Sequence, residues 1–263
     1  MMRCLLLLIG LSILTNDWTA ADETEASSRF SKLATKIASS YEIQSGDQTL
    51  KLRSEPVLTW TNPEVGEIYG AVFIWTDDKR PAVIASIFKW YAPFTHRTHE
   101  FQSLVTDPIR ATRDGKTDWQ TEQPGITWKP VPGNPSTGTT AAQAFTRMRF
   151  VAKRFEVELT DKDGSVETLR LLSQPLYRYQ NPENGIEEGA LFAFARATDP
   201  EALLLLEVRR ENGVDKLYYA LARSNFLPLK ATFEGAEVWT KGRLLRRDSY
   251  SGKGAYAKVQ FDD

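Results

Sequence analysis

The chain has 263 residues with 33 basic and 34 acidic side chains, so its formal net charge is −1. Because both signs are spread along the sequence, there is no electrostatic case for binding to nucleic acid or to an anionic membrane. The single cysteine, Cys4, excludes disulfides and thiolate chemistry from a folded form that begins near Asp22. The 11% aromatic content is typical of a well-packed globular protein.

The first 21 residues have the pattern of a signal peptide. Arg3 precedes the apolar run Cys4–Leu14, and small residues follow, ending at Ala21. About eleven apolar residues are too few for a membrane-spanning helix, which needs about 20. We therefore expect cleavage after Ala21, no membrane span in the mature chain and a secreted or periplasmic location, with an uncleaved anchor as the alternative.

One phrase occurs twice. Leu50–Phe73 and Leu169–Phe192 are identical at eleven of 24 positions, with a constant separation of 119 residues. Such self-similarity predicts an internal duplication. The first copy is expected over residues 28–122 and the second over 138–263, joined by a proline-rich linker at 123–137.

Each copy is predicted to begin with a helix and to continue as strands. Apolar residues at helical spacing run from Phe30 to Ile37 and from Ala141 to Ala152. Antiparallel strands are expected at 41–44, 49–53, 57–61, 67–75, 82–90, 100–106 and 109–113, with counterparts in the second copy. The predicted fold class is therefore α+β, with one helix and an antiparallel β-meander per copy. Because residues 69–75 are apolar on both faces, the copies are expected to pack as a pseudo-dimer.

The shared phrase contains residues that favour a turn. An Asn-Pro pair restricts the backbone, and a glycine three positions after the proline can adopt the positive φ that closes a turn. The residues predicted to form this structural turn motif are Asn62, Pro63, Gly66, Asn181, Pro182 and Gly185. Gly70 and Gly189 lie inside predicted strands, which indicates a bulge or a close contact.

Few residues suggest metal or cofactor chemistry. His96, His99 and Glu100 could hold a metal on a helix, but the local sequence favours a strand, where residues three apart face opposite sides. Neither a serine-nucleophile elbow nor a phosphate or dinucleotide loop is present. Ser251–Gly254 is expected to be a hairpin turn. We therefore predict no catalytic residue, no cofactor and no metal site beyond this weak candidate.

Three further groups of residues have both a structural and a functional interpretation. The carboxylates of the repeated turns could perform acid–base chemistry, but more often such residues face water. The aromatic residues could line a groove, but their alternation with apolar residues favours a core. The basic group could form a specific anion site, but it is expected to lie on a solvated strand or hairpin edge. The groups are, in that order, Glu64, Glu183, Glu187 and Glu188; Trp60, Trp75, Trp90, Tyr177 and Tyr179; and Lys241, Arg243, Arg246 and Arg247.

The second copy resembles a group of uncharacterised secreted bacterial proteins. The resemblance rests on Ser173–Tyr179, Gly189–Phe194, Thr198–Glu201 and Leu203–Leu206, and the first copy shares it less well. It implies export and a bacterial source, and it implies no activity and no catalytic residue.

Three functions follow as hypotheses. The first is an exported, non-catalytic protein that binds a protein or small-molecule partner or has a structural role in the cell envelope. The second is a carrier of a small apolar or glycan ligand, which requires a pocket of a few hundred Å3. The third is a hydrolase with two carboxyl groups about 5 to 10 Å apart in a cleft. The sequence predicts neither the partner nor the oligomeric state.

Overall fold

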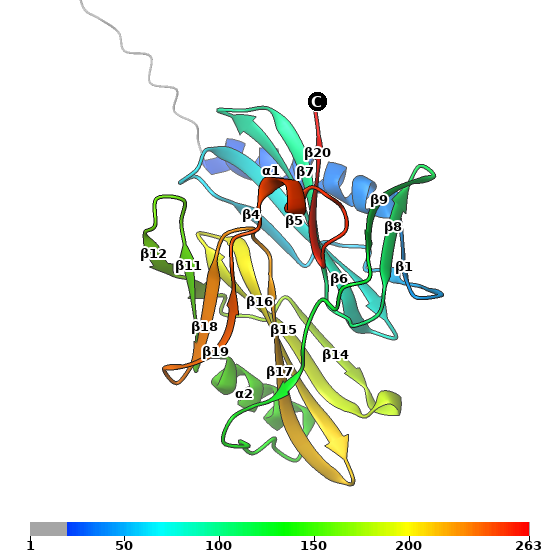
Figure 1. Cartoon of the computed structure of the whole chain (residues 1–263), viewed down its shortest axis with the longest axis vertical. Coiled ribbons are helices and arrows are strands. Elements are labelled where there is room, and N and C mark those ends of the chain that lie inside the picture. The colour runs from blue at the N-terminus through cyan, green and yellow to red at the C-terminus, as the bar shows by residue number, and fades with distance from the viewer. Residues whose placement is uncertain (1–19, 263) are drawn as a thin grey trace, which may run out of the picture.

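A computed structural model describes residues 20–262 of the chain (Figure 1). Of the predicted signal peptide, only Ala20 and Ala21 are among the described residues, and they begin helix α1 (Ala20–Ser39). The predicted α+β fold, with one helix and one meander in each copy packed as a pseudo-dimer, is wrong. The chain is mostly β, with 53% strand and 14% helix, and its strands form four sheets.

The first half of the described chain contains α1 and nine strands. Their bounds are β1 (Tyr41–Ser45), β2 (Gln48–Thr49), β3 (Lys51–Leu52), β4 (Leu58–Thr61), β5 (Glu67–Asp77), β6 (Arg80–Ala92), β7 (His96–Ser103), β8 (Ile109–Arg113) and β9 (Lys116–Thr121). One sheet has the strand order β2-β1-β8-β9. The longer strands lie in another sheet, in which β4 and β3 both pair with β5, and β6 and β7 follow.

The second half contains two helices, a single 3-10 turn and eleven strands. In chain order these are β10 (Lys129–Pro130), α2 (Ala141–Ala152), β11 (Phe155–Thr160), β12 (Val166–Thr168), β13 (Arg170–Leu171), β14 (Tyr177–Asn181), η1 (Pro182–Asn184), β15 (Ile186–Arg196), β16 (Asp199–Glu211), β17 (Val214–Arg223), β18 (Leu229–Phe233), β19 (Ala236–Lys241), α3 (Arg246–Ser249) and β20 (Tyr256–Phe261). The sheet orders are β12-β11-β18-β19 and β10-β17-β16-β15-β13, with β14 also paired to β15. All of these pairings are antiparallel, as predicted.

The single meander fails because the chain changes sheet within one predicted strand. β2 pairs with β1, whereas β3, only two residues later, pairs with β5. Between them Leu50 donates its backbone N–H to Ile43 and is buried in the core. Leu169 makes the matching bond to Val157. This one-residue transition divides the strands of each half between two sheets.

Helix α2 illustrates why the sequence forms its elements where it does. The hydroxyl oxygen of Thr140 accepts a hydrogen bond from the backbone N–H of Gln143 at the N-terminus, an arrangement that stabilises helix starts. The buried face consists of Ala144, Met148, Val151 and Ala152. These residues recur at helical spacing, so one face of the helix covers the sheet beneath it.

Three clusters of buried residues hold the fold together. One lies under α1 and includes Phe73 and Trp119, and another lies under α2 and includes Phe192. The third joins the inner faces of the two large sheets and contains Ile74 and Leu205. Residues 69–75 are apolar on both sides because Val72 and Ile74 face this cluster between the sheets, whereas the alternate residues, Phe73 among them, face the cluster under α1.

One strand is exchanged between the halves, because β20 ends the second half but pairs with β7 of the first. β10, which begins the second half, pairs with β17 of the same half. Figure 1 shows β20, in red, beside β7 and β6 of the other half. Residues 123–137 are therefore not only a linker, because they contain β10 and the buried Val131. The exchange places Lys258 of β20 opposite Glu100 of β7.

Candidate functional site

The connection between β19 and β20 crosses the surface of the protein. We call residues 242–255 the strap, and it includes helix α3. The guanidinium of Arg223 anchors the first residue of the strap, because its Nη2 donates to the carbonyl oxygen of Gly242 at 3.0 Å and to that of Leu227 at 2.8 Å. The indole Nε1 of Trp119 donates to Gly254 at 2.8 Å and holds its end. The hairpin turn predicted at Ser251–Gly254 is wrong, because these residues connect helix α3 to β20 as part of the strap.

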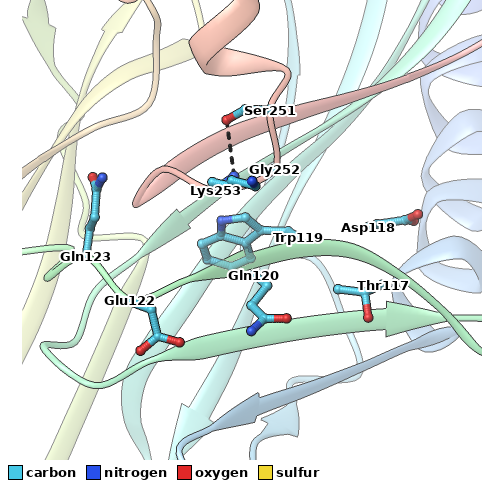
Figure 2. Close-up of a pocket in the computed structure, with 9 residues that line it drawn as sticks. All are labelled: Thr117, Asp118, Trp119, Gln120, Glu122, Gln123, Ser251, Gly252 and Lys253. Atoms are coloured by element: carbon cyan, nitrogen blue, oxygen red, sulfur yellow. Dashed lines mark hydrogen bonds between the residues drawn. The ribbon is translucent and has the colours of Figure 1, made fainter.

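Three of the hollows formed by the described residues flank the strap. The first, of about 510 Å3, lies where β9 meets Ser251, Gly252 and Lys253. Figure 2 shows the indole of Trp119 beneath these strap residues, while the carboxylate of Asp118 points away from them. A second hollow of about 430 Å3 lies between the strap and Arg223. The third, which we call the basic hollow, has a volume of about 400 Å3.

The basic hollow combines positive charge with apolar surface. Among the described residues, its lining contains no carboxylate and consists of Lys162, Phe226, Arg243, Leu244, Leu245, Arg246, Ser249, Tyr250 and Lys258. Arg243 and Arg246 are exposed. The guanidinium of Arg246 lies 5.2 Å from the centre of the Tyr250 ring. An arrangement of this kind can bind an anion that also has an apolar part.

A buried charged group lies beneath this hollow. Lys258 forms an ion pair with Glu100, and its ammonium lies 4.8 Å from the centre of the Phe226 ring. Glu201, which is 4% exposed, accepts a hydrogen bond from the side-chain amide of Asn225. Asp199 lies beside Glu201 at the start of β16. We call Glu100, Asp199 and Glu201 the carboxyl cluster.

The environment changes the proton affinity of this cluster. Burial raises the pKa of Glu201 to about 7, with a further contribution from Glu100 and an opposing one from the hydrogen bond of Asn225. Burial also raises the pKa of Asp199 well above its ordinary value, as do the neighbouring Glu201 and Glu100. For Lys258, burial opposes the charged form, but the Glu100 carboxylate outweighs it and raises the pKa.

A second buried polar group lies on the side of α1. The hydroxyl of Tyr41 donates to Asp118 at 2.9 Å and lies 2.7 Å from Nδ1 of His99. Burial, followed by the nearby Arg113 and Arg97, lowers the pKa of His99 to about 3. Tyr41 lies opposite Arg113 on strands β1 and β8. At the matching positions of the second half, on β11 and β18, Phe155 lies opposite Phe233. A fold of this kind therefore does not require polar residues here.

The structure does not bring the weak metal candidates together. His96 stacks on Trp90, with ring centres 6.1 Å apart, whereas His99 is buried against Tyr41 and Glu100 pairs with Lys258. Within residues 20–262 there is no group of three His, Cys, Asp or Glu side chains arranged to hold a metal ion.

The predicted turn motif lies in the two strand connections where it was expected. Gly66 and Gly185 both have positive φ angles, of 142° and 73°. The side-chain amide of Asn181 donates to the carbonyl oxygen of Asp78 at 3.2 Å and so connects the two halves. The remaining motif residues, Asn62, Pro63 and Pro182, frame the same turns.

The carboxylates of the repeated phrase lie apart from the strap. Glu64 and Glu183 are exposed in their turns. Glu187 pairs with Arg210 at 3.2 Å. Glu188 is buried but accepts hydrogen bonds from Arg178 and Gln180. These residues have the surface and ion-pair roles of structural carboxylates.

The aromatic residues mostly belong to the core. Trp60, Trp75 and Tyr179 are at most 4% exposed. Trp90 and Tyr177 are half-buried. A different set, Phe226 and Tyr250, contributes to the basic hollow. Sequence periodicity identified the core aromatics but not those of the hollow.

The basic stretch was the only signal in the sequence for this site. The interpretation of Lys241, Arg243, Arg246 and Arg247 as a strand or hairpin edge was wrong for three of them. Only Lys241 ends a strand, β19, while the arginines lie on the strap. Their gathering with Lys162, Lys258 and the carboxyl cluster depends on distant segments, so the sequence contained no local signal for it.

Comparison with known proteins found no match among protein-family models, curated proteins or solved structures. In the part of the chain from Ala20 to Asp262, no helix has the length and apolar character needed to cross a membrane. The function is therefore inferred from the chemistry of the site.

Proposed function

We propose that this protein is an exported, non-catalytic binding protein whose basic hollow holds an organic anion. The acidic group of the ligand would face Arg243, Arg246 and Lys162, and its apolar part would lie on Phe226 and Leu244. The observation that supports this is the convergence of cationic side chains on one hollow with an apolar wall. Export rests on the signal peptide pattern of residues 1–21.

The cations of the hollow are available to a ligand. Among the described residues, Lys162, Arg243 and Arg246 have no carboxylate partner within ion-pair distance, whereas Arg247 pairs with Asp248 at 3.4 Å. Arginine donates in a fork that matches sulfonate, phosphate and carboxylate oxygens. Three positive charges gathered in this way repel one another, and a bound anion would relieve that repulsion.

The apolar wall selects among anions. Leu245 is 50% exposed and Tyr250 is 36% exposed, so part of the wall remains open to water. Covering apolar surface contributes about 25 cal/mol per Å2. An anion with an aromatic or alkyl part should therefore bind more tightly than inorganic phosphate or sulfate. The proposal thus narrows the carrier hypothesis to ligands that have an acidic group as well as an apolar part.

The test uses 8-anilinonaphthalene-1-sulfonate, a permanently charged aromatic sulfonate whose fluorescence rises on binding. Wild-type protein and the variants Arg243→Ala and Arg246→Ala are titrated at low salt, with calorimetry to count sites. We expect each substitution to weaken binding about tenfold, because a charge-assisted hydrogen bond is lost. The uncharged N-phenyl-1-naphthylamine tests the apolar wall alone and should bind more weakly.

The matched control is Arg247→Ala. This arginine has the same charge and is the next residue along the chain, but it is not part of the lining. Its removal should leave affinity within about twofold, because an exposed charge outside the site acts only through a screened field. Equal losses for Arg246→Ala and Arg247→Ala would show general attraction to the surface and would contradict the proposed site.

A further inference from the structure

We infer that anion binding in the basic hollow takes up a proton at the carboxyl cluster beneath it, so that affinity rises as pH falls from 8 to 6. This inference rests on the proposed function and adds its regulation. It starts from one residue, Lys258, which belongs to both sites. Its side chain lines the basic hollow and forms the ion pair with Glu100, each being 11% exposed.

The carboxyl cluster has more acidic groups than available cations. Glu100 comes from β7, and Asp199 and Glu201 come from β16. Lys258 of β20 is their ion-pair partner through Glu100. Arg196 of β15 also influences Glu201, but its guanidinium is bonded to Asp161 and Glu167 at 2.9 and 2.7 Å. Glu201 is buried and Glu100 and Asp199 are partly buried, and like charges in such a group disfavour full ionisation of the cluster.

The other polar groups nearby do not supply the missing charge. Tyr256 of β20 is 3% exposed and remains neutral, because burial and then Glu100 raise the pKa of its hydroxyl. Arg223 of β17 is committed to backbone carbonyl oxygens. Asn225 donates to Glu201 but is uncharged. Tyr250 is close enough to Lys258 to influence it electrostatically, but it is on the hollow side.

These carboxyl groups are not required by the strand geometry. Arg80 and Asp77 pair at the β5–β6 turn, and Asp199 and Arg196 pair at the matching β15–β16 turn. At the positions that Asp199 and Glu201 occupy in this hairpin, the other hairpin has Arg80 and Ala82. The same hairpin thus forms with a cation and a methyl group at these positions.

A bound anion and the carboxyl cluster would both interact with the positive charge of Lys258. The anion would place a second negative charge near the ammonium, which lines the hollow and already pairs with Glu100 of the carboxyl cluster. The added charge disfavours ionised Glu201 and Asp199, so the cluster binds protons more tightly when the ligand is present. By linkage, the protonated protein then binds the anion more tightly by the same factor. We expect affinity about three- to tenfold higher at pH 6 than at pH 8.

The experiment measures the affinity for 8-anilinonaphthalene-1-sulfonate from pH 5.5 to 8.5. Its sulfonate does not titrate in this range, and the cationic buffers Bis-Tris and Tris allow chloride to be the one competing anion, at a constant concentration. The slope of log affinity against pH gives the number of protons taken up. The variants are Glu201→Gln and Asp199→Asn, which mimic protonated carboxyl groups. Glu183→Gln removes one exposed carboxylate of a distant turn as the charge-matched control.

The inference is supported if Glu183→Gln keeps the wild-type change in affinity between pH 8 and pH 6. In Glu201→Gln or Asp199→Asn, affinity should change less than twofold over the same range. Circular dichroism and thermal unfolding establish that each variant is folded, and the two variants substitute for each other if one does not fold. A flat wild-type profile, or a slope that persists in both variants, would overturn the coupling. Either result leaves the proposed function intact if Arg246→Ala still weakens binding.

Discussion

Arg80 and Glu207 form a bidentate ion pair between the two large sheets. Nε and Nη2 of Arg80 donate to the two carboxylate oxygens of Glu207 at 2.8 and 3.1 Å. Glu207 is fully buried and also accepts hydrogen bonds from the Tyr179 hydroxyl at 2.8 Å and from Arg209 at 2.7 Å. The carboxylate of β16 therefore has a partner from β6 in the other half.

Arg80→Ala should destabilise the protein by about 3 kcal/mol, because it removes the cross-sheet partner of a buried charge. Urea unfolding measured by tryptophan fluorescence would give the change. The matched control is Arg210→Ala, which removes a more exposed arginine paired to Asp215 at 2.9 Å and should cost less than about 1 kcal/mol. Equal effects would mean that the Arg80 pair does not hold the sheets together.

Gly70→Ala should disrupt the core between the sheets. A Cβ at this position would lie 2.0 Å from Cε2 of Trp60, whose indole is buried and donates to Ser86 at 3.0 Å. The ring must move, so we expect a loss of about 2 to 4 kcal/mol and a red-shifted tryptophan emission. Gly242→Ala is the control, since no atom of a described residue lies within 4 Å of the methyl group that alanine would add there. An unchanged emission spectrum for Gly70→Ala would contradict the contact.

Arg223→Ala should loosen the strap and weaken ligand binding together. Its guanidinium donates to the carbonyl oxygens of Asn225, Leu227 and Gly242, and removal leaves these acceptors unsatisfied. We expect a cost of about 2 to 3 kcal/mol and faster amide hydrogen exchange over residues 242–250. Sulfonate affinity should fall although Arg223 does not line the basic hollow. Unchanged exchange in the strap would rule out this anchoring role.

His99 should make the fold sensitive to acid. Its pKa in the folded protein is about 3, against an ordinary value of 6.5, so the unfolded chain binds the proton first as pH falls below 6.5. The stability contributed by neutral His99 is therefore complete above pH 6.5 and is lost as pH falls toward 3. Between pH 7.5 and 5 this amounts to about 2 kcal/mol.

His99→Gln should remove this part of the pH dependence, and His96→Gln, at the half-buried histidine stacked on Trp90, should retain it. The measurement is the free energy of unfolding of each variant at both pH values. Glu201 acts in the opposite direction, because its raised pKa makes the folded state gain stability as pH falls from about 7 to 4.5. Comparing variants cancels that contribution. An identical pH dependence for His99→Gln and wild type would contradict a buried neutral histidine.

Local chemistry predicted much of the secondary structure. Gly66 and Gly185 have φ angles of 142° and 73°, as expected for the glycines that close the repeated turns. Helix α2 occupies the interval from Ala141 to Ala152 that its apolar spacing indicated. The close contact expected at Gly70 is present, although its partner is the Trp60 ring. Such features depend on neighbouring residues, so one sequence is sufficient to predict them.

Long-range contacts determine the features that the sequence did not predict, namely the division into sheets and the site. No local pattern distinguishes the sheet change at Leu50 from a continuous strand, because it depends on which partner, β1 or β5, each residue meets. The pairing of β20 with β7 likewise depends on the closure of the whole chain. That pairing brings Lys258 to Glu100, and the start of β16 brings Glu201 beneath the same surface. Neighbouring residues were thus enough to predict most strands and the turns of the repeated segment. The shared buried environment of these distant charges exists only in the folded chain, since burial and proximity set their proton affinity.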